Sequence, residues 1–332
     1  MYNQNSGYGQ AVMNMLASKL GTFGRVLVVF NPSDTADENY QRLQEIAKVD
    51  PNGDVRFFTT IEAAYDAAKT NNNDVILINA HSNHYVAACL TVSKNRIHFI
   101  GMGTWGAADM QPEVALETAA TVTPATMKVT GYGNTFTNLY FTNNGTDNTS
   151  LAAVIDAGEN TVYTNCSFSK QSDLDQTLCA NVLAGGDTTT WRNCKFGVEW
   201  LTVSAARASL LVSTTSGGIM KHNIFEDCYF IQATSSNGAF HIKVAASSLT
   251  FSNIWKNCIF MNPVMTTGTL IVQTKAVSAA SAGVGDGTLF FVNPATNSTD
   301  FCTDSTKVYV VGANYGDAAT STSTIGIGIV PA

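Results

Sequence analysis

The sequence predicts an all-β chain whose short parallel strands stack into a solenoid, and two repeated motifs predict it. The first motif reads aromatic, any residue, Asn or Asp, Cys or Leu, any residue, Phe. It occurs as FTNLYF (136–141), YTNCSF (163–168), WRNCKF (191–196), FEDCYF (225–230) and WKNCIF (255–260). The fourth positions, Leu139, Cys166, Cys194, Cys228 and Cys258, follow one another at intervals of 27, 28, 34 and 30 residues. Repeats of this length are typical of supersecondary units that stack on their neighbours.

The second motif is a five-residue apolar segment that precedes each copy of the first. It occurs as ATMKV (125–129), AAVID (152–156), ANVLA (180–184), SLLVS (209–213) and FHIKV (240–244), and we align the copies at Met127, Val154, Val182, Val212 and Ile242. Both motifs are rich in β-branched and aromatic residues, which favours strands, and glycines lie between them. Two strands per repeat without an intervening helix predict one coil of a parallel β-solenoid, not a βαβ unit or a propeller blade.

The first motif also predicts a cross-section of the coil. Its Cys and Phe lie two residues apart, so both point from one strand face into the interior. The third positions, Asn138, Asn165, Asn193, Asp227 and Asn257, mark a turn at which amides of neighbouring coils form a ladder. Asp227 either bonds differently or interrupts that ladder. The leading aromatic residues either fill the core, which we favour, or form an outward stripe for sugar rings.

Composition narrows the class of protein. The chain has 332 residues, of which 45% are hydrophobic and only 13% charged, compared with about 25% charged in ordinary soluble proteins. A net charge of −7 and the lack of a basic cluster argue against nucleic acid as a partner. No apolar run is long enough to span a membrane. Seven cysteines without a Cys-x-x-Cys pair predict reduced thiols and no metal or other cofactor.

The segment FFTTIEAAYDAAKTNNNDVILINA (57–80) predicts a helix followed by a buried strand. Thr59 or Thr60 is placed to cap the helix, whose apolar residues share one face. The strand–turn–strand segment LTVSKNRIHFIGMG (90–103) then closes at Gly101 and Gly103. We interpret this region as a capping helix followed by the first coil.

This entry, followed by the coils, resembles the pectate-lyase-like superfamily of right-handed parallel β-helices, in which x-I-x-A-A-x-x-A-A … D-x-I-x-I caps the solenoid. With NYQRLQEIAKVDPNGDVRFFTTIEAAYDAA (39–68) ahead of the coils, the chain is most similar to virion structural proteins of tailed bacteriophages. The resemblance covers residues 25–275. It implies an all-β, right-handed parallel β-helix with an N-terminal capping helix and a strand-rich C-terminal cap. We expect a docking arm (1–24), capping helix and first coil (25–100), further coils (101–275) and a cap or oligomer contact (276–332).

Enzymes of that superfamily use clustered Asp ligands for calcium beside an Arg or Lys base, or carboxylates on adjacent coils. Such acids must recur at one position, because neighbouring coils lie only about 4.8 Å apart. We find no such pair, and Asp173 and Asp175 in the loop SKQSDLDQT are the best remaining candidates for a glycan or acid site. His81 and His84 follow a strand, so a loop role is favoured over metal binding. The sequence therefore predicts no catalytic residue and no metal.

These observations predict a non-enzymatic phage virion protein, attached to the capsid or another head structure as a decoration or spike. Its partners would be capsid or other virion proteins, and symmetric copies favour a homotrimer. The reduced thiols and the lack of a signal peptide predict folding in the bacterial host cytoplasm. The alternative is a tailspike-like glycan-binding or glycan-cleaving protein on the same fold.

Overall fold

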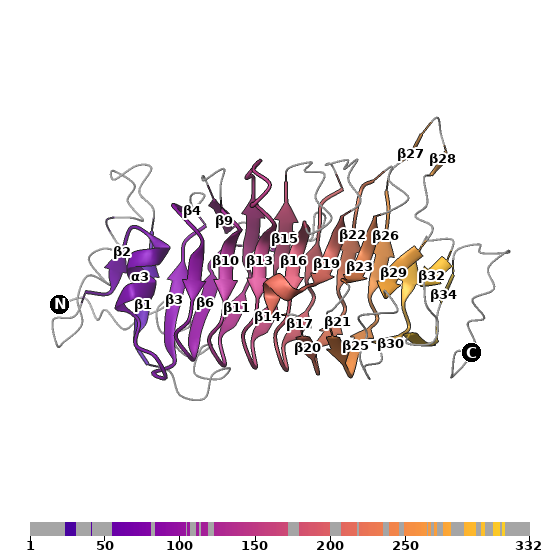
Figure 1. The fold of residues 1–332 in the computed structure, drawn as a ribbon. Helices are drawn as coiled ribbons and strands as arrows, with labels where there is room; N and C mark the ends of the chain where they lie inside the picture. The colour runs from indigo at the N-terminus through magenta and orange to yellow at the C-terminus, as the bar shows by residue number, and fades with distance from the viewer. Residues whose placement is uncertain are drawn as a thin grey trace.

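The structure is a computed structural model in which short strands lie side by side along one axis, from the indigo N-terminal end to the yellow C-terminal end (Figure 1). It describes residues 24–30, 41, 55–80, 84–103, 105–106, 111–112, 114–118, 123–171, 179–199, 207–217, 219–234, 239–245, 249–263, 265–266, 269–270, 275–279, 289–296, 300–302, 308–312 and 314–315. No helix among these residues is long and apolar enough to cross a membrane.

Within the described residues, three parallel sheets form the sides of the solenoid. Sheet 1 contains, in spatial order, β2 (Phe57–Phe58), β1 (Val26–Val29), β3 (Asp74–Ile78), β6 (Ile97–Gly101), β11 (Thr135–Thr137), β14 (Val162–Thr164), β17 (Thr190–Arg192), β21 (Ile224–Glu226), β25 (Asn253–Lys256), β30 (Leu289–Val292) and β33 (Val308–Val311). Sheet 2 contains β34 (Asn314–Tyr315), β31 (Ala295–Thr296), β26 (Ile259–Met261), β22 (Tyr229–Ile231), β18 (Lys195–Phe196), β15 (Ser167–Lys170), β12 (Tyr140–Asn143), β9 (Ala115–Thr118) and β4 (His84–Val86).

Sheet 3 completes each coil, so the chain runs from sheet 3 to sheet 1, then to sheet 2 and back. It contains β32 (Asp300–Cys302), β29 (Lys275–Ala279), β23 (Phe240–Val244), β19 (Ala208–Val212), β16 (Ala180–Ala184), β13 (Ala152–Asp156), β10 (Ala125–Val129) and β5 (Leu90–Val92). Smaller elements are the parallel pair β20 (Ile219–Lys221) and β24 (Leu249–Phe251), the hairpins β7 (Trp105–Gly106) with β8 (Gln111–Pro112) and β27 (Met265–Thr266) with β28 (Thr269–Leu270), and the 3-10 turn η1 (Thr214–Ser216).

The capping helix α3 (Ile61–Ala67) covers the N-terminal part of the solenoid (Figure 1). Thr60 is its N-cap, because its hydroxyl accepts the Ala63 N–H at 3.2 Å. The Tyr65 hydroxyl accepts the backbone N–H groups of Ser93 and Lys94 at 2.7 and 2.8 Å. The Lys94 ammonium in turn donates to carbonyls at the end of the helix, which completes that terminus. These bonds join the cap to the first coil.

The core contains two stacks of aromatic rings with edge-to-face contacts between them, packed with the aliphatic residues of sheet 3. The leading aromatic residues of the first motif point inward from sheet 1, so they fill the core and form no outward stripe. Their stack comprises Phe99, Phe136, Tyr163, Trp191, Phe225, Trp255 and Phe291, with ring centroids 4.0 to 5.7 Å apart. A second stack from sheet 2 comprises Phe141, Phe168, Phe196, Phe230 and Phe260, with spacings of 4.5 to 5.4 Å.

At the corner between sheets 1 and 2 the chain turns through one residue in the left-handed conformation. That residue is Asn138, Asn165, Asn193, Asp227, Asn257 or Asn293, with φ between 50° and 58°. The Asn193 amide donates to Asn165 Oδ1 at 2.9 Å, and the Asn257 amide donates to Asp227 Oδ1 at 3.2 Å. Asp227 has no amide with which to continue toward Asn193, so the ladder is interrupted at that coil.

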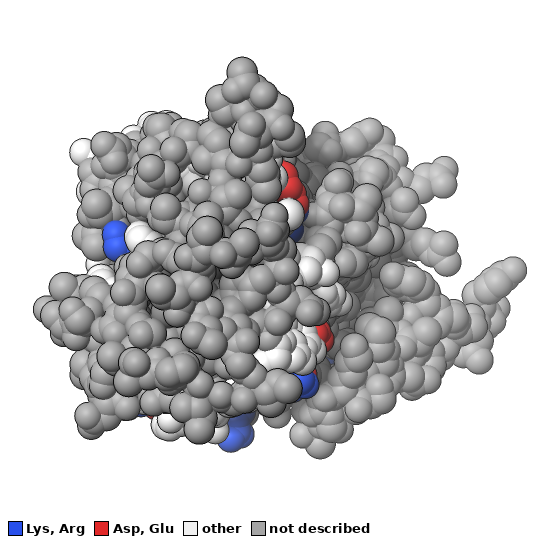
Figure 2. Space-filling model, turned by 90° about the vertical axis from the view of Figure 1, so that its right-hand side faces the viewer, with Lys and Arg blue, Asp and Glu red and all other residues white. Residues whose placement is uncertain are grey.

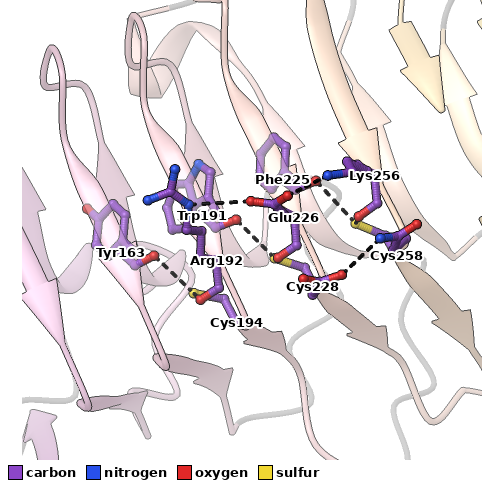
Figure 3. A network of polar contacts seen from close by, with 11 residues as sticks. Tyr163, Trp191, Arg192, Cys194, Phe225, Glu226, Cys228, Lys256 and Cys258 are labelled. Atoms are coloured by element: carbon purple, nitrogen blue, oxygen red, sulfur yellow. Dashed lines mark hydrogen bonds and ion pairs between the residues drawn. The ribbon is translucent and has the colours of Figure 1, made fainter. Parts of the chain in front are cut away.

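The next residue in four of these coils is a buried cysteine, and Cys166, Cys194, Cys228 and Cys258 form one column. Each thiol donates to the backbone carbonyl of the aromatic residue in the preceding coil, at 3.4 to 3.6 Å. Figure 3 shows three of these contacts, and beside them the ion pairs that Glu226 makes with Arg192 and Lys256 at 3.4 and 2.7 Å. The thiols thus satisfy their donors inside the core.

The alignment of one coil differs from the sequence expectation. Val182 pairs with Leu210, which in turn pairs with Ile242, so Val212 is the wrong alignment point for that coil. Leu210 and Val212 lie on the same face of the strand, so from the sequence either residue could be taken as the equivalent of Val182. Strands β30 and β33 extend sheet 1 past residue 275, within the segment expected as a strand-rich cap or oligomer contact.

Replacing Phe196 by Ala should lower the free energy of unfolding by about 3–5 kcal/mol, because a fully buried ring leaves a cavity between two stacked neighbours. Urea unfolding monitored by circular dichroism measures this. Phe290→Ala is the control, since that side chain is 37% exposed on the outer face of sheet 1. Equal losses from the two variants would contradict the stacked core.

Replacing Asp227 by Asn should raise the free energy of unfolding by about 0.5–1.5 kcal/mol, because it supplies the missing donor of the ladder. The reverse change, Asn257→Asp, removes the donor of an existing 3.2 Å bond and should lower it. Thermal unfolding of the two variants, compared with the native chain, tests the opposite signs. A shift of the same sign in both would count against the ladder.

Candidate functional site

The residues that the sequence singled out for chemistry do not form a site in the part of the chain that the structure describes. Asp173, Asp175 and His81 lie outside the described residues. His84 is buried, its Nε2 lies 2.7 Å from the Asn79 carbonyl, and burial lowers its pKa. Burial also raises the thiol pKa of Cys194, Cys228 and Cys258 well above the ordinary value, so their reactive thiolate form is disfavoured.

The corner between sheets 3 and 1 brings together functional side chains from successive coils. Here too the chain turns through one left-handed residue per coil: Arg96, Gly133, Asn160, Thr188, His222 and Ser252, with φ between 49° and 68°. The residue just before the turn pairs with its counterpart in the next coil, in the order Tyr132, Glu159, Asp187, Lys221. We call these four residues, together with His222, the corner row.

Backbone hydrogen bonds hold the two acidic members of the corner row at the same position on adjacent coils. The Asp187 N–H donates to the Gly158 carbonyl at 3.0 Å, and the Asn160 N–H donates to the Asp187 carbonyl at 2.9 Å. Paired strands lie about 4.8 Å apart. Glu159 and Asp187 therefore form a column of carboxylates, although no such column was expected from the sequence.

The corner row is open to solvent. Tyr132 is 42% exposed, and the side chains of Asp187 and His222 are 36% and 60% exposed. Asp187 is the most firmly held carboxylate, because Lys221 Nζ lies 3.7 Å from one oxygen and His222 Nδ1 lies 3.4 Å from the other. The Thr188 hydroxyl also donates to Asp187 at 3.0 Å. The row thus combines an aromatic ring, two carboxylates, an ammonium group and an imidazole.

The two corners use different residues for the same backbone conformation. The corner between sheets 1 and 2 has Asn or Asp at six left-handed positions and Gly312 after β33, which are residues that this conformation tolerates well. The corner between sheets 3 and 1 has Gly133 and Asn160 but also Thr188 and His222, and a β-branched residue with φ of 59° is an outlier. Such strain is concentrated at functional sites in proteins, which points to a role for these side chains beyond the turn.

A simple count along the sequence would have found this row. Tyr132, Glu159, Asp187 and Lys221 each stand seven residues before the fourth position of their motif. The statement that no acid pair repeats at one offset is therefore wrong. The two acids also stand five residues after the alignment points of the second motif, Val154 and Val182, so a count from either motif aligns them.

A buried carboxyl lies beneath the corner row. Asp156 is 1% exposed and pairs with Val129 and Ala184, which belong to the interior column. Its Oδ2 accepts the Thr189 hydroxyl at 3.0 Å, and the Tyr163 hydroxyl donates to its Oδ1 at 3.4 Å. Burial raises the pKa of Asp156 to about 7, although these hydrogen bonds favour the ionised form.

In the view onto the C-terminal end, the described acidic and basic side chains appear in small groups of both signs (Figure 2). Within the described ranges, no group of three or more His, Cys, Asp or Glu side chains is arranged to hold a metal ion.

Comparisons with known proteins identify the fold. No protein-family model matches the chain. No curated protein matches it in sequence. Pectin methylesterase PemA from Erwinia chrysanthemi is similar in structure, with a TM-score of 0.51 and 14% identity over 92% of both chains. Pectate lyase Pel9A has a TM-score of 0.50 and 10% identity, covering 89% of this chain and 78% of that chain.

These similarities confirm the predicted right-handed parallel β-helix, and at 10–14% identity they show the fold alone. They contradict the prediction of a non-enzymatic protein, since both similar structures are enzymes. The physical premise of that prediction, the missing column of acids, also fails at Glu159 and Asp187. Neither similarity bears on a place in a virion.

Replacing Thr188 by Asn should raise the free energy of unfolding by about 1 kcal/mol, because Asn tolerates the left-handed conformation that a β-branched residue resists. Differential scanning calorimetry measures the shift. Asn160→Thr is the matched reverse change one coil away and should lower the stability. If Thr188→Asn destabilises the chain, the bond from Thr188 to Asp187 outweighs the backbone strain.

Proposed function

We propose that the protein is a tailspike-like, glycan-acting β-helix protein that binds a polysaccharide along the corner row and cleaves it there. The observation that carries the proposal is the pair Glu159 and Asp187, held at one position on adjacent coils and open to solvent. Support for the class of substrate comes from PemA and Pel9A, whose names state an action on pectin and pectate.

The corner row has the groups that a sugar chain needs for binding. A sugar ring has an apolar face that packs on an exposed aromatic ring, and Tyr132 offers one at one end of the row. Lys221 and His222 offer hydrogen-bond donors at the other end. A glycan lying along the solenoid axis would therefore cross both carboxylates between an aromatic contact and a polar one.

The two carboxyl groups suit glycosidic bond cleavage. Retaining glycosidases hold their two carboxyl groups about 5–5.5 Å apart, close to the coil spacing of about 4.8 Å. We assign Asp187, fixed by Lys221, His222 and Thr188, as the nucleophile that attacks the anomeric carbon. Glu159 protonates the leaving glycosidic oxygen, then accepts a proton from the water that releases the sugar from Asp187. Stereochemistry is thereby retained.

We further propose that the protein attaches to a capsid or another virion protein, forms a homotrimer and folds in the bacterial host cytoplasm. The resemblance to phage proteins and the reduced cysteines support this proposal. A tailspike would unite that resemblance with the corner row, because it is a virion component whose substrate is a glycan.

Replacing Glu159 by Gln or Asp187 by Asn should lower the rate of polysaccharide cleavage at least about 100-fold, because each removes one proton-transferring or nucleophilic group. Release of reducing ends from pectin, alginate and bacterial capsular polysaccharides measures it. Tyr132→Ala should weaken binding of the same polymers with a smaller effect on the rate of the bound complex.

Asp147→Asn is the matched control, because Asp147 is an exposed carboxylate that accepts bonds from Thr149, away from the corner row. It should leave cleavage and binding unchanged. Full cleavage by both Glu159→Gln and Asp187→Asn would refute the assignment of the site. A native chain that neither binds nor cleaves any glycan of the panel would refute the function itself.

A further inference from the structure

Asp156 is the buried carboxyl that touches both turns bearing the acids of the corner row. It lies two residues before Gly158, whose backbone N–H bonds its carboxylate, and Gly158 precedes Glu159. On the next coil its Oδ2 accepts the hydroxyl of Thr189, two residues after Asp187. One side chain therefore contacts the turn of Glu159 and the turn of Asp187 from below.

The backbone of the second turn approaches this carboxylate closely. A Cβ atom added at Gly186, the residue before Asp187, would lie 2.6 Å from Asp156 Oδ2. Only glycine fits at this distance, so the turn is seated directly on the carboxyl group. Other residues of the same interior column, such as Val129 and Ala184, are apolar and offer no such bonds.

We propose that Asp156 is a positioning residue that holds the turns of Glu159 and Asp187 in register, and that its loss of a proton loosens them. The proposal rests on the proposed function for its catalytic consequence, although the coupling of the two turns stands on geometry alone. A protonated carboxyl fits this dry position, since it carries no charge and the hydroxyl of Thr189 or Tyr163 can turn to accept its proton while the other still donates.

The groups that face Asp156 make it the titrating member of the cluster. Thr189 and the Gly158 backbone are neutral, and Tyr163 is the ionisable neighbour. Burial raises the pKa of Tyr163 well above its ordinary value, so its phenol remains protonated and remains a donor. Among the described residues around this carboxyl, no cation is placed to stabilise its charge.

The sign of the pH dependence follows from the two states of Asp156. Its pKa is about 7 in the folded chain, against 3.8 in an opened one. The folded state holds the proton more tightly, so the stabilisation is complete below about pH 4, falls as the pH rises and reaches its lowest value above pH 7. Opening of the two turns should therefore become easier over this range, by up to about tenfold per pH unit.

Amide hydrogen exchange of the native chain tests this directly. The amides of Asn160 and Asp187 form the two bonds that join the turns, at 2.9 and 3.0 Å. Their protection, measured relative to intrinsic exchange rates, should fall from pH 5 to pH 7 and then level off. The Asn257 amide, bonded to the Val292 carbonyl in the other corner, should show no such fall. Constant protection at Asn160 and Asp187 would overturn the proposal.

Two variants distinguish the effect of the Asp156 proton from the effect of its side-chain contacts. Asp156→Asn keeps the shape and should make the protection of these two amides independent of pH, whereas Asp156→Ala should lower it at every pH. The same pH-dependent loss in Asp156→Asn would overturn the proposal. Hydrogen exchange needs no substrate, so the coupling of the two turns can be confirmed or refuted whether or not the protein cleaves a glycan. If cleavage is found, Asp156→Asn should also retain more of its activity between pH 5 and pH 7 than the native chain does.

Discussion

The rest of the structure depends on the one-residue left-handed turn at two corners of each coil from β10 to β26. A residue with positive φ reverses the side-chain alternation within a single position, so strands on both sides of the corner can point apolar residues inward. Because these coils turn at the same position, equivalent residues lie directly above one another. The aromatic stacks, the thiol column and the corner row are all consequences of this register.

The same constraint explains how polar groups are tolerated inside the solenoid. A thiol following the turn reaches the carbonyl of the preceding coil, so Cys194 and its counterparts satisfy their only donor without leaving the core. The Asn193 amide bonds to its equivalent in the neighbouring coil. Asp156 is a costly case, because a buried carboxyl must either stay protonated or carry an unpaired charge. Such a cost is expected where a protein needs a fixed group beneath a working surface.

The two corners divide structure from function. The corner between sheets 1 and 2 uses the residues that its backbone prefers and forms a ladder. The corner between sheets 3 and 1 tolerates Thr188 and His222 in the same conformation and exposes charged and aromatic neighbours. This contrast between similar backbone turns is the reason that the proposed site lies at the second corner. A solenoid repeats positions, so two acids on adjacent coils are enough to build a catalytic pair.

The sequence by itself determined the strands, their repeat and the inward Cys and Phe columns, because periodic apolar residues and Asn at a turn are local signals. It left the direction of the leading aromatic residues open, since parity across a left-handed turn depends on a backbone angle that the letters do not specify. It misaligned one coil at Val212, where two residues of one face compete. The common distance of Glu159 and Asp187 from both motifs was already in the sequence, but the tertiary structure alone decided that this position lies at a solvent-facing corner. Residues 28 positions apart become neighbours only after the coils stack.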